Sequence, residues 1–181
     1  IRTPLEPNKT YSDDPLRMMR AVRFASELNF TIKRDSIESI KENSNRLSII
    51  SKERIIDELN KIILSKNPSK GFNLLFQTKL LHQFFPEMVS LHGVETIMKK
   101  SHKDNFNHTL EVLENISKKS ENIWLRWAAI MHDIGKPKTK RFNDKTGWTF
   151  HGHEELGARM VPKIFKRLKL PMDRKMKYVQ K

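Results

Sequence analysis

Apolar side chains recur along most of the chain with the three-to-four-residue spacing of helices that bury one face. The clearest helix is predicted from Pro15 to about Asn29, with Asp14 as its cap and Pro15 at its first position. Its apolar stripe consists of Met18, Ala21, Val22, Ala25 and Leu28. Similar spacing predicts helices over residues 35–43, 52–64, 68–79, 106–118, 122–132 and 154–168, and from 171 onward. We therefore expect an all-α fold.

Three stretches lack this pattern. The first thirteen residues contain Pro4 and Pro7 and are expected to form an extended lead-in. Residues 80–100 are irregular, which suggests a boundary between a helical region over residues 1–98 and a second helical domain over residues 99–181. Residues 138–150 are expected to form a basic loop or a short hairpin.

The helix over residues 122–132 differs from the others because it is apolar on nearly every face, which predicts that it is buried. It is followed by Gly135, Lys136 and Pro137. This order is typical of a glycine that caps a helix and a proline that prevents its continuation.

Charge is distributed unevenly over the 181 residues, whose net charge is +14. Residues 1–98 carry 15 Lys and Arg against 12 Asp and Glu, whereas residues 136–181 carry 14 against 4. Such a concentration favours a phosphate-rich partner, although a solvated lysine-rich surface would give the same count. The absence of cysteine excludes disulfides and thiolate metal sites and suits a cytoplasmic protein. No apolar run approaches the ~20 residues of a membrane span, so no membrane partner is expected.

Acidic and basic residues cluster where the first long helix begins. At 100° per residue, Asp13, Arg17, Arg20 and Phe24 fall on one narrow face, with Asp14 at its edge. A carboxylate beside a guanidinium presents an acceptor and a donor that match a base edge, and Arg20 is placed to meet phosphate. An ordinary helix cap with an Asp13–Arg17 pair would use the same residues.

Histidines and one aspartate form a second cluster of interest: His108, the pair His132–Asp133, His151 and His153. A charge at the end of a buried helix is costly unless it is compensated, and a bound cation would compensate it. Imidazole and carboxylate ligands without thiolate suit Mg²⁺, Mn²⁺, Co²⁺, Ni²⁺ or iron better than structural zinc. Core histidines satisfied by hydrogen bonds are the alternative interpretation.

The run from Thr3 to Ala25, with Tyr11-Ser12-Asp13-Asp14-Pro15-Leu16-Arg17 at its centre, closely resembles the neck of bacterial-type (class II) tRNA nucleotidyltransferases, the CCA-adding enzymes, and poly(A) polymerases. The resemblance implies that Asp14 and Arg17 read the base of the incoming CTP or ATP. Asp13 stands where the family often has glutamate.

Residues 51–59 resemble the next motif of that family, in which Glu53 and Arg54 would hold the neck helices in place. By spacing alone, Arg54 and Glu58 also fit an i,i+4 surface pair. The motif and the surface pair are compatible.

The segments around His108, from Ala128 to Pro137 and from Phe150 to Glu154 resemble the metal-dependent HD phosphohydrolase superfamily, in particular the HD domain appended to some tRNA nucleotidyltransferases. The resemblance implies that His108, His132 and Asp133 bind metal, that His153 serves a second metal or the substrate, and that Lys136 contacts phosphate. The superfamily has a further aspartate on a later helix, and Asp173 comes too early for it. We therefore expect a domain truncated at its C-terminus.

The catalytic carboxylates that hold Mg²⁺ in this family lie on a β-rich head, and nothing here resembles that head. The chain is thus expected to be a fragment that recognises CTP or ATP and binds tRNA or other RNA without transferring nucleotides. A stand-alone HD phosphohydrolase acting on nucleotides or cyclic phosphates, and a non-catalytic RNA-binding helical module, are the alternatives. CCA, C-only, A-only and poly(A) specificity stay open, as does the oligomeric state.

Overall fold

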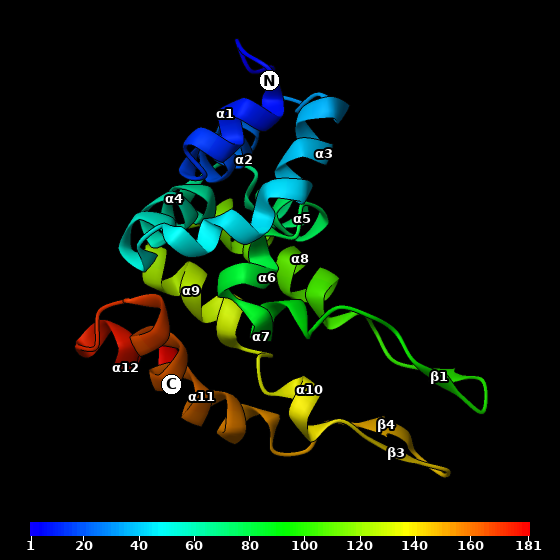
Figure 1. Ribbon diagram of the computed structural model, residues 1–181. Helices are drawn as coiled ribbons and strands as arrows, with labels where there is room; N and C mark the ends of the chain where they lie inside the picture. The colour runs from blue at the N-terminus through cyan, green and yellow to red at the C-terminus, as the bar shows by residue number, and fades with distance from the viewer.

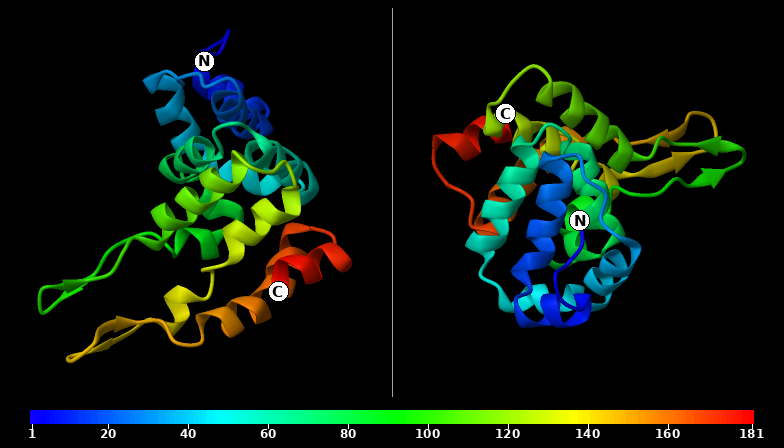
Figure 2. Two further views of the ribbon diagram at one scale, coloured as in Figure 1. Left: turned by 180° about the vertical axis from the view of Figure 1, so that it is seen from behind. Right: turned by 90° about the horizontal axis from the view of Figure 1, so that it is seen from above.

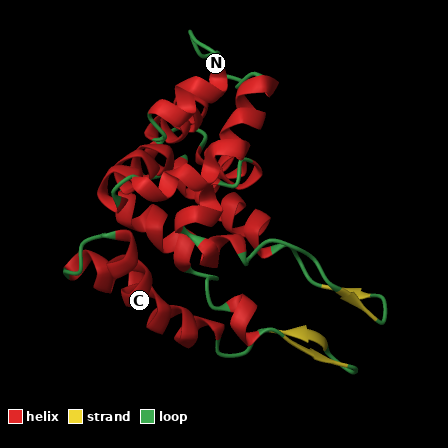
Figure 3. Cartoon of the chain, in the orientation of Figure 1, coloured by secondary structure: helices red, strands yellow, loops and turns green.

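The structure is a computed structural model that describes residues 1–181. Helices dominate it, as the apolar spacing predicts, and the only strands belong to two small hairpins (Figure 3). The elements are α1 (Pro7–Asp13), α2 (Leu16–Glu27), α3 (Arg34–Asn43), the 3₁₀ helix η1 (Ser44–Ile49), α4 (Lys52–Leu64), α5 (Pro68–Gln77), α6 (Leu80–Phe84), α7 (Pro86–Val89), β1 (Thr96–Ile97), β2 (Lys100–Ser101), α8 (Asn105–Ser117), α9 (Ile123–Met131), α10 (Lys136–Thr139), β3 (Arg141–Asn143), β4 (Gly147–Thr149), α11 (His153–Leu168) and α12 (Arg174–Gln180). None of these helices is long and apolar enough to cross a bilayer.

The prediction of an extended N-terminal lead-in is wrong, because α1 occupies residues 7–13. Pro7 stands at the first helical position, where its missing N–H costs nothing. The Glu6 carboxylate caps the helix by accepting hydrogen bonds from the backbone N–H groups of Asn8 and Lys9, at 2.9 and 2.7 Å. Asp13 consequently ends α1, and it does not share a helix face with Arg17.

The helix that follows begins one residue later than predicted, with Pro15 at the cap position and Leu16 as its first residue. The side chain of Asp14 still performs the capping function, since its Oδ1 accepts a hydrogen bond from the Leu16 N–H at 3.2 Å. The predicted apolar stripe of α2 is confirmed for Met18, Ala21, Val22 and Ala25, which are buried, but it is wrong for Leu28, which lies just after the helix and is 53% exposed. The buried face packs against α4 and α5.

One continuous hydrophobic core extends through the helical body, from Tyr11 in α1 to Val179 in α12. Helix α9 is largely buried, as its composition predicts, and it joins the two halves of the chain. The indole of Trp127 on α9 donates a hydrogen bond to Asn60 Oδ1 on α4 at 3.0 Å. The boundary near residue 98 stays a prediction; the core is continuous on both sides of it.

Arg126 on α9 is a buried cation that makes this junction polar as well as apolar. Its guanidinium donates to the carbonyls of Ile63 and Ser65 at the end of α4, at 2.6 and 3.1 Å. It also donates to the carbonyl of Ser117 at the end of α8, at 3.1 Å. The last carbonyls of a helix have no partner within it, so Arg126 satisfies two helix ends at once.

The two β-hairpins project together from the helical body (Figures 1 and 2). We call residues 94–103 and 140–150 the hairpin arm. The β3–β4 hairpin confirms the hairpin alternative for residues 138–150, whereas β1–β2 was not predicted. Its two-residue turn consists of Met98 and Lys99, with φ of 50° and 62°. Such turns usually carry Asn-Gly, whereas Met98-Lys99 is not a residue pair that predicts a hairpin.

The predicted capping function of Gly135 is also wrong. Its φ is −82°, an ordinary helical value, and α9 ends earlier at Met131. A Cβ at Gly135 would lie 2.2 Å from the carbonyl oxygen of His153 and 2.9 Å from the backbone nitrogen of Gly157. Glycine is therefore required because the first turn of α11 packs directly against this backbone. That close approach brings His153 to the end of α9.

Candidate metal centre and base-recognition site

Asp133 lies at the centre of the histidine cluster, in the turn after α9, and is only 2% exposed. Its Oδ2 is 3.2 Å from His132 Nε2 and 3.9 Å from His108 Nε2, which comes from α8. Its Oδ1 is 3.5 Å from His153 Nε2, at the start of α11. Three helices thus place imidazole nitrogens around one buried carboxylate. His151, by contrast, is exposed and lies outside this group.

Hydrogen bonds to the backbone fix the orientation of two of these rings. His132 Nδ1 lies 2.7 Å from the carbonyl oxygen of Ala129, and His153 Nδ1 lies 2.8 Å from that of Phe150. A carbonyl oxygen can only accept a hydrogen bond, so Nδ1 carries the hydrogen in both rings. The Nε2 atoms then face the Asp133 carboxylate: each offers a lone pair when its ring is neutral, whereas His132 Nε2 donates to Asp133 when its ring is protonated. This is the orientation that metal-binding histidines adopt in proteins.

Lys136 supplies a positive charge to the cluster, because its Nζ donates to Asp133 Oδ2 at 2.7 Å. Burial by itself raises the pKa of Asp133, but the hydrogen bonds from His132 and Lys136 lower that pKa to about 2. Burial lowers the pKa of His132, while its bonds to Asp133 and to the Ala129 carbonyl raise it above its usual value. The carboxylate is therefore ionised and attracts protons or cations.

The donor set fits a divalent cation. One ligand atom from each of His108, His132 and Asp133 lies within 4.8 Å of the others. When the imidazoles are neutral, their lone pairs and the carboxylate oxygens are electron-rich atoms in close contact. A cation between them relieves that repulsion. Two nitrogens and one carboxylate without thiolate suit Mg²⁺, Mn²⁺, Co²⁺ or Ni²⁺.

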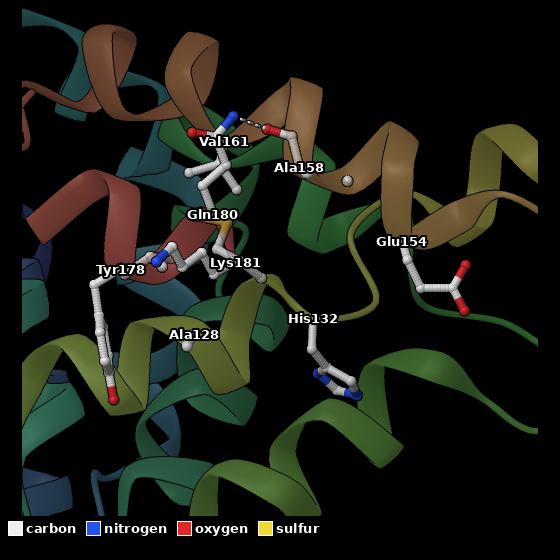
Figure 4. Close-up of a pocket in the computed structure, with 11 residues that line it drawn as sticks. Ala128, His132, Glu154, Ala158, Val161, Tyr178, Gln180 and Lys181 are labelled. Carbon is white, nitrogen blue, oxygen red and sulfur yellow. Dashed lines mark hydrogen bonds between the residues drawn. The ribbon is translucent and has the colours of Figure 1, made fainter.

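A cavity of about 280 Å³ adjoins the cluster, between α9, α11 and α12. His132 and Glu154 lie on one side of it and Tyr178 on the other (Figure 4). The Gln180 side chain closes part of its wall by donating to the carbonyl of Ala158 at 3.0 Å. Asp173, which is too early for the further aspartate of the HD superfamily, caps α12 by accepting from the Lys175 N–H at 2.8 Å.

The second group of predicted site residues lies at the start of α2, far along the body from the histidines (Figure 1). Arg17 Nε is 3.7 Å from Asp14 Oδ2, and the two side chains are 48% and 30% exposed. The structure thus brings Asp14 and Arg17 together on an accessible surface. Asp13 is exposed at the end of α1 and forms no ion pair with Arg17.

Glu58 on α4 is a buried carboxylate beneath this surface, with only 3% of its area exposed. Its Oε2 forms an ion pair with Arg23 Nη1 at 2.9 Å, and its Oε1 lies 3.7 Å from Arg20 Nε and 3.4 Å from Lys61 Nζ. The surface pair between Arg54 and Glu58 expected from spacing is therefore absent. Glu58 ties α4 to α2 instead.

Glu53 and Arg54, the residues that the motif resemblance implies as supports, are exposed and form no ion pair. Glu58 and Arg23 join α4 to α2 instead, and this contact was not predicted from the sequence. Their signal was available: each is a charged residue within the buried stripe of its helix, three residues after Ile55 and four after Met19. Opposite charges on the apolar faces of two packed helices predict a buried pair.

Comparisons with known proteins agree with this arrangement. A family model described as a probable RNA and SrmB-binding site of polymerase A matches residues 29–91, and the HD domain model matches residues 105–180. The fold and the histidine cluster thus define a helical polymerase-type RNA-binding region joined to an HD domain.

Curated relatives specify the family further. The chain is 34% identical over 166 residues to the A-adding tRNA nucleotidyltransferase of Deinococcus radiodurans, covering 87% of this chain and 38% of that protein. It is 35% identical over 170 residues to the multifunctional CCA protein of Shewanella frigidimarina, covering 90% of this chain and 40% of that protein. By these matches the chain belongs to the tRNA nucleotidyltransferase and poly(A) polymerase family. It spans about two fifths of the length of these relatives.

Proposed function

We propose that this chain is the part of a tRNA nucleotidyltransferase that recognises the incoming CTP or ATP and binds tRNA, and that its HD domain is a metal-dependent phosphohydrolase. The observation that supports base recognition is the pairing of Asp14 with Arg17 on an accessible surface. The relatives support the family context, and both matched regions begin after this pair.

Base selection follows from hydrogen-bond chemistry. Cytosine and adenine each offer an amino group beside a ring nitrogen that accepts, whereas uracil and guanine offer a carbonyl beside a ring N–H. A carboxylate accepts from the amino group, and a guanidinium donates to the ring nitrogen. Asp14 and Arg17 therefore complement CTP and ATP. With UTP or GTP, the carboxylate would face a carbonyl and the guanidinium would face a ring N–H, so that acceptor meets acceptor and donor meets donor. Arg20, whose Nε lies 3.7 Å from Glu58 Oε1, is a further cation for phosphate.

The test uses the full-length protein that contains this chain and a tRNA transcript that ends before CCA. Arg17→Ala is expected to reduce the preference for CTP and ATP over UTP and GTP by about tenfold or more, since a bidentate base contact contributes about 1–3 kcal/mol to discrimination. Arg34→Ala is the matched control, because Arg34 is 92% exposed on α3. Unchanged selection among the four nucleotides in Arg17→Ala would contradict base recognition by this pair.

The HD domain carries the second activity, for which the lone-pair geometry around Asp133 is the supporting observation. His108, His132 and Asp133 would hold the cation, which supplies a Lewis acid that polarises a phosphoryl oxygen. Lys136 offers its ammonium to a substrate phosphate. His153 Nε2 is placed to bind a second ion or the substrate.

Hydrolysis of a 2′,3′-cyclic nucleotide by the purified chain tests this activity. We expect turnover with Mn²⁺ or Co²⁺ that EDTA abolishes and fresh metal restores. Metal binding without turnover would leave a non-catalytic RNA-binding module with a metal site. If neither metal binding nor turnover is observed, the proposed phosphohydrolase activity is contradicted.

A further inference from the structure

We infer that the hairpin arm is a second RNA-binding surface, which holds backbone phosphates and is separate from the helical region at residues 29–91. The inference rests on the proposed function in that RNA is the partner of the chain. The arm lies outside the polymerase-type RNA-binding match. No residue of the arm belongs to the hydrophobic core of the body, and it extends away from that body (Figure 2).

Specific contacts hold the arm together although only Gly147 is buried within it. Lys100 joins the two hairpins by donating to the carbonyls of Asp144 and Lys145, 44 and 45 residues further along the chain, both at 2.8 Å. The Trp148 indole donates back to the Lys100 carbonyl at 3.0 Å. The arm is therefore a built projection with a fixed relation between its two hairpins.

Positive charge is what this projection presents. Its six Lys and Arg residues face only two carboxylates, those of Glu95 and Asp144. Lys140 pairs with Glu95 at 2.5 Å, which neutralises one charge of each sign. The remaining cations have no carboxylate partner, and Lys99, Arg141 and Lys145 are exposed. A row of unpaired cations on a projecting surface is complementary to a polyanion.

Phosphate contact, rather than base stacking, is the mode that these contacts favour. The aromatic rings of the arm are already engaged: Trp148 meets Phe142 and His102 edge to face, at 5.2 and 5.1 Å between ring centroids. Lys140 lies 5.2 Å from the Trp148 ring on another side. With the rings occupied internally, the exposed cations remain as the contact groups. We therefore expect binding that depends on salt and not on sequence.

The β1–β2 turn supports a contact function at the tip. Met98 and Lys99 both adopt positive φ, a conformation that asparagine or glycine adopts with less strain. Met98 is 69% exposed, so packing within the chain does not explain the choice. The turn instead places Lys99 at the far end of the arm. Residues held in a backbone conformation that their residue type rarely adopts are concentrated at functional positions.

Binding of a tRNA transcript lacking CCA to the 181-residue chain tests the inference, measured across a range of KCl concentrations. The arm variant is the triple charge reversal Lys99→Glu, Arg141→Glu, Lys145→Glu. Its matched control is Lys163→Glu, Lys166→Glu, Lys177→Glu, three exposed lysines of α11 and α12 that form no ion pair. Both variants change the net charge by the same amount, so the position of the charges is the only variable. Circular dichroism and thermal melting verify that both fold.

We expect the arm variant to lose affinity by about tenfold or more near 0.15 M KCl and the slope of log K against log salt to fall by about 2 to 3. The control is expected to keep most of its slope. Equal losses in the two variants would show a general charge effect and overturn the inference while leaving RNA binding intact. An arm variant that binds like the unsubstituted chain overturns it too, and points to a protein partner for the exposed tip. Failure of the unsubstituted chain to bind the transcript would instead contradict the proposed function.

Discussion

Two buried carboxylates, Glu58 near the base-recognition surface and Asp133 in the histidine cluster, have opposite surroundings. Glu58 meets Arg23, Arg20 and Lys61, cations that keep their charge at every physiological pH. Asp133 meets one lysine and three imidazoles, the side chains that most often bind metals in proteins. Every charged neighbour of the first carboxylate is a Lys or Arg, whereas the second has one lysine and three imidazoles of the kind that bind a metal. Burial of a carboxylate therefore does not identify a functional site; the protonation chemistry of its neighbours does.

The largest expected effect concerns Glu58. Glu58→Gln would remove the nearer of the two carboxylates of Arg23 and leave only Glu27, 3.5 Å from its Nε. Breaking a buried pair on one side costs up to about 3–5 kcal/mol. Urea denaturation of the purified chain measures this loss in the free energy of unfolding. Glu53→Gln, an exposed substitution on the same helix, is expected to change it by no more than about 0.5 kcal/mol. Similar values for the two variants would mean that Glu58 has no structural function.

The next largest effect is expected on metal affinity at Asp133. Asp133→Asn is expected to weaken Mn²⁺ binding by about 100-fold or more, because it removes the one charged ligand of the proposed set. Isothermal titration calorimetry measures the affinity, and saturating Mn²⁺ should raise the melting temperature of the unsubstituted chain alone. Asp144→Asn, an exposed acid in the hairpin turn, is the matched control. Mn²⁺ affinity that survives Asp133→Asn would refute the assignment of this ligand.

The next effect is expected on the free energy of unfolding in acid, to which Asp133 contributes. The pKa of Asp133 lies at about 2 in the folded chain, below its usual value of 3.8. A lowered pKa stabilises the fold above the unfolded value, and the contribution disappears as the pH falls from about 4 to about 2. We expect the unsubstituted chain to lose about 2 kcal/mol more over this interval than Asp133→Asn does. Denaturation curves at closely spaced pH values measure the difference, and parallel curves would contradict the lowered pKa.

The smallest effect is expected where an ion pair is exposed. Glu87 on α7 accepts from Arg167 Nη1 on α11 at 2.6 Å, and Arg167 is 41% exposed. Burial raises the pKa of Glu87, but the bond from Arg167 lowers it overall, so the pair stabilises at neutral pH and weakens in acid. A double-mutant cycle with Glu87→Gln and Arg167→Gln should give a coupling below about 1 kcal/mol. A coupling as large as the Glu58 effect would remove the distinction between buried and exposed pairs.

The sequence predicts most of the helices because apolar spacing reports directly which face of a helix is buried. The bounds of α4, Lys52–Leu64, agree with the prediction at both ends. Proline is the main source of error: Pro7 predicts extended chain, but it begins α1 because Glu6 supplies the cap. The β1–β2 hairpin escaped prediction because Met98 and Lys99 do not have the composition of a turn.

The candidate sites were predictable to the extent that their residues are neighbours in sequence. Asp14 and Arg17 are one helical turn apart, and His132 is adjacent to Asp133, so their proximity follows from local geometry. The bond between Glu58 and Arg23 depends on how α2 packs against α4, which spacing within one helix does not reveal. The function of Gly135 depends likewise on α11, since only the tertiary approach of His153 shows why a side chain is excluded there.

Arg126 has a consequence for how such proteins diverge. Its guanidinium completes helix ends on one side of residue 98 and on the other. The two matched regions could be exchanged between ancestral genes as separate segments, but each exchange would have to provide new donors for the carbonyls of Ile63, Ser65 and Ser117. A recombinant lacking them would carry unpaired polar groups in its interior. One side chain thereby makes the two matched regions dependent on each other in folding.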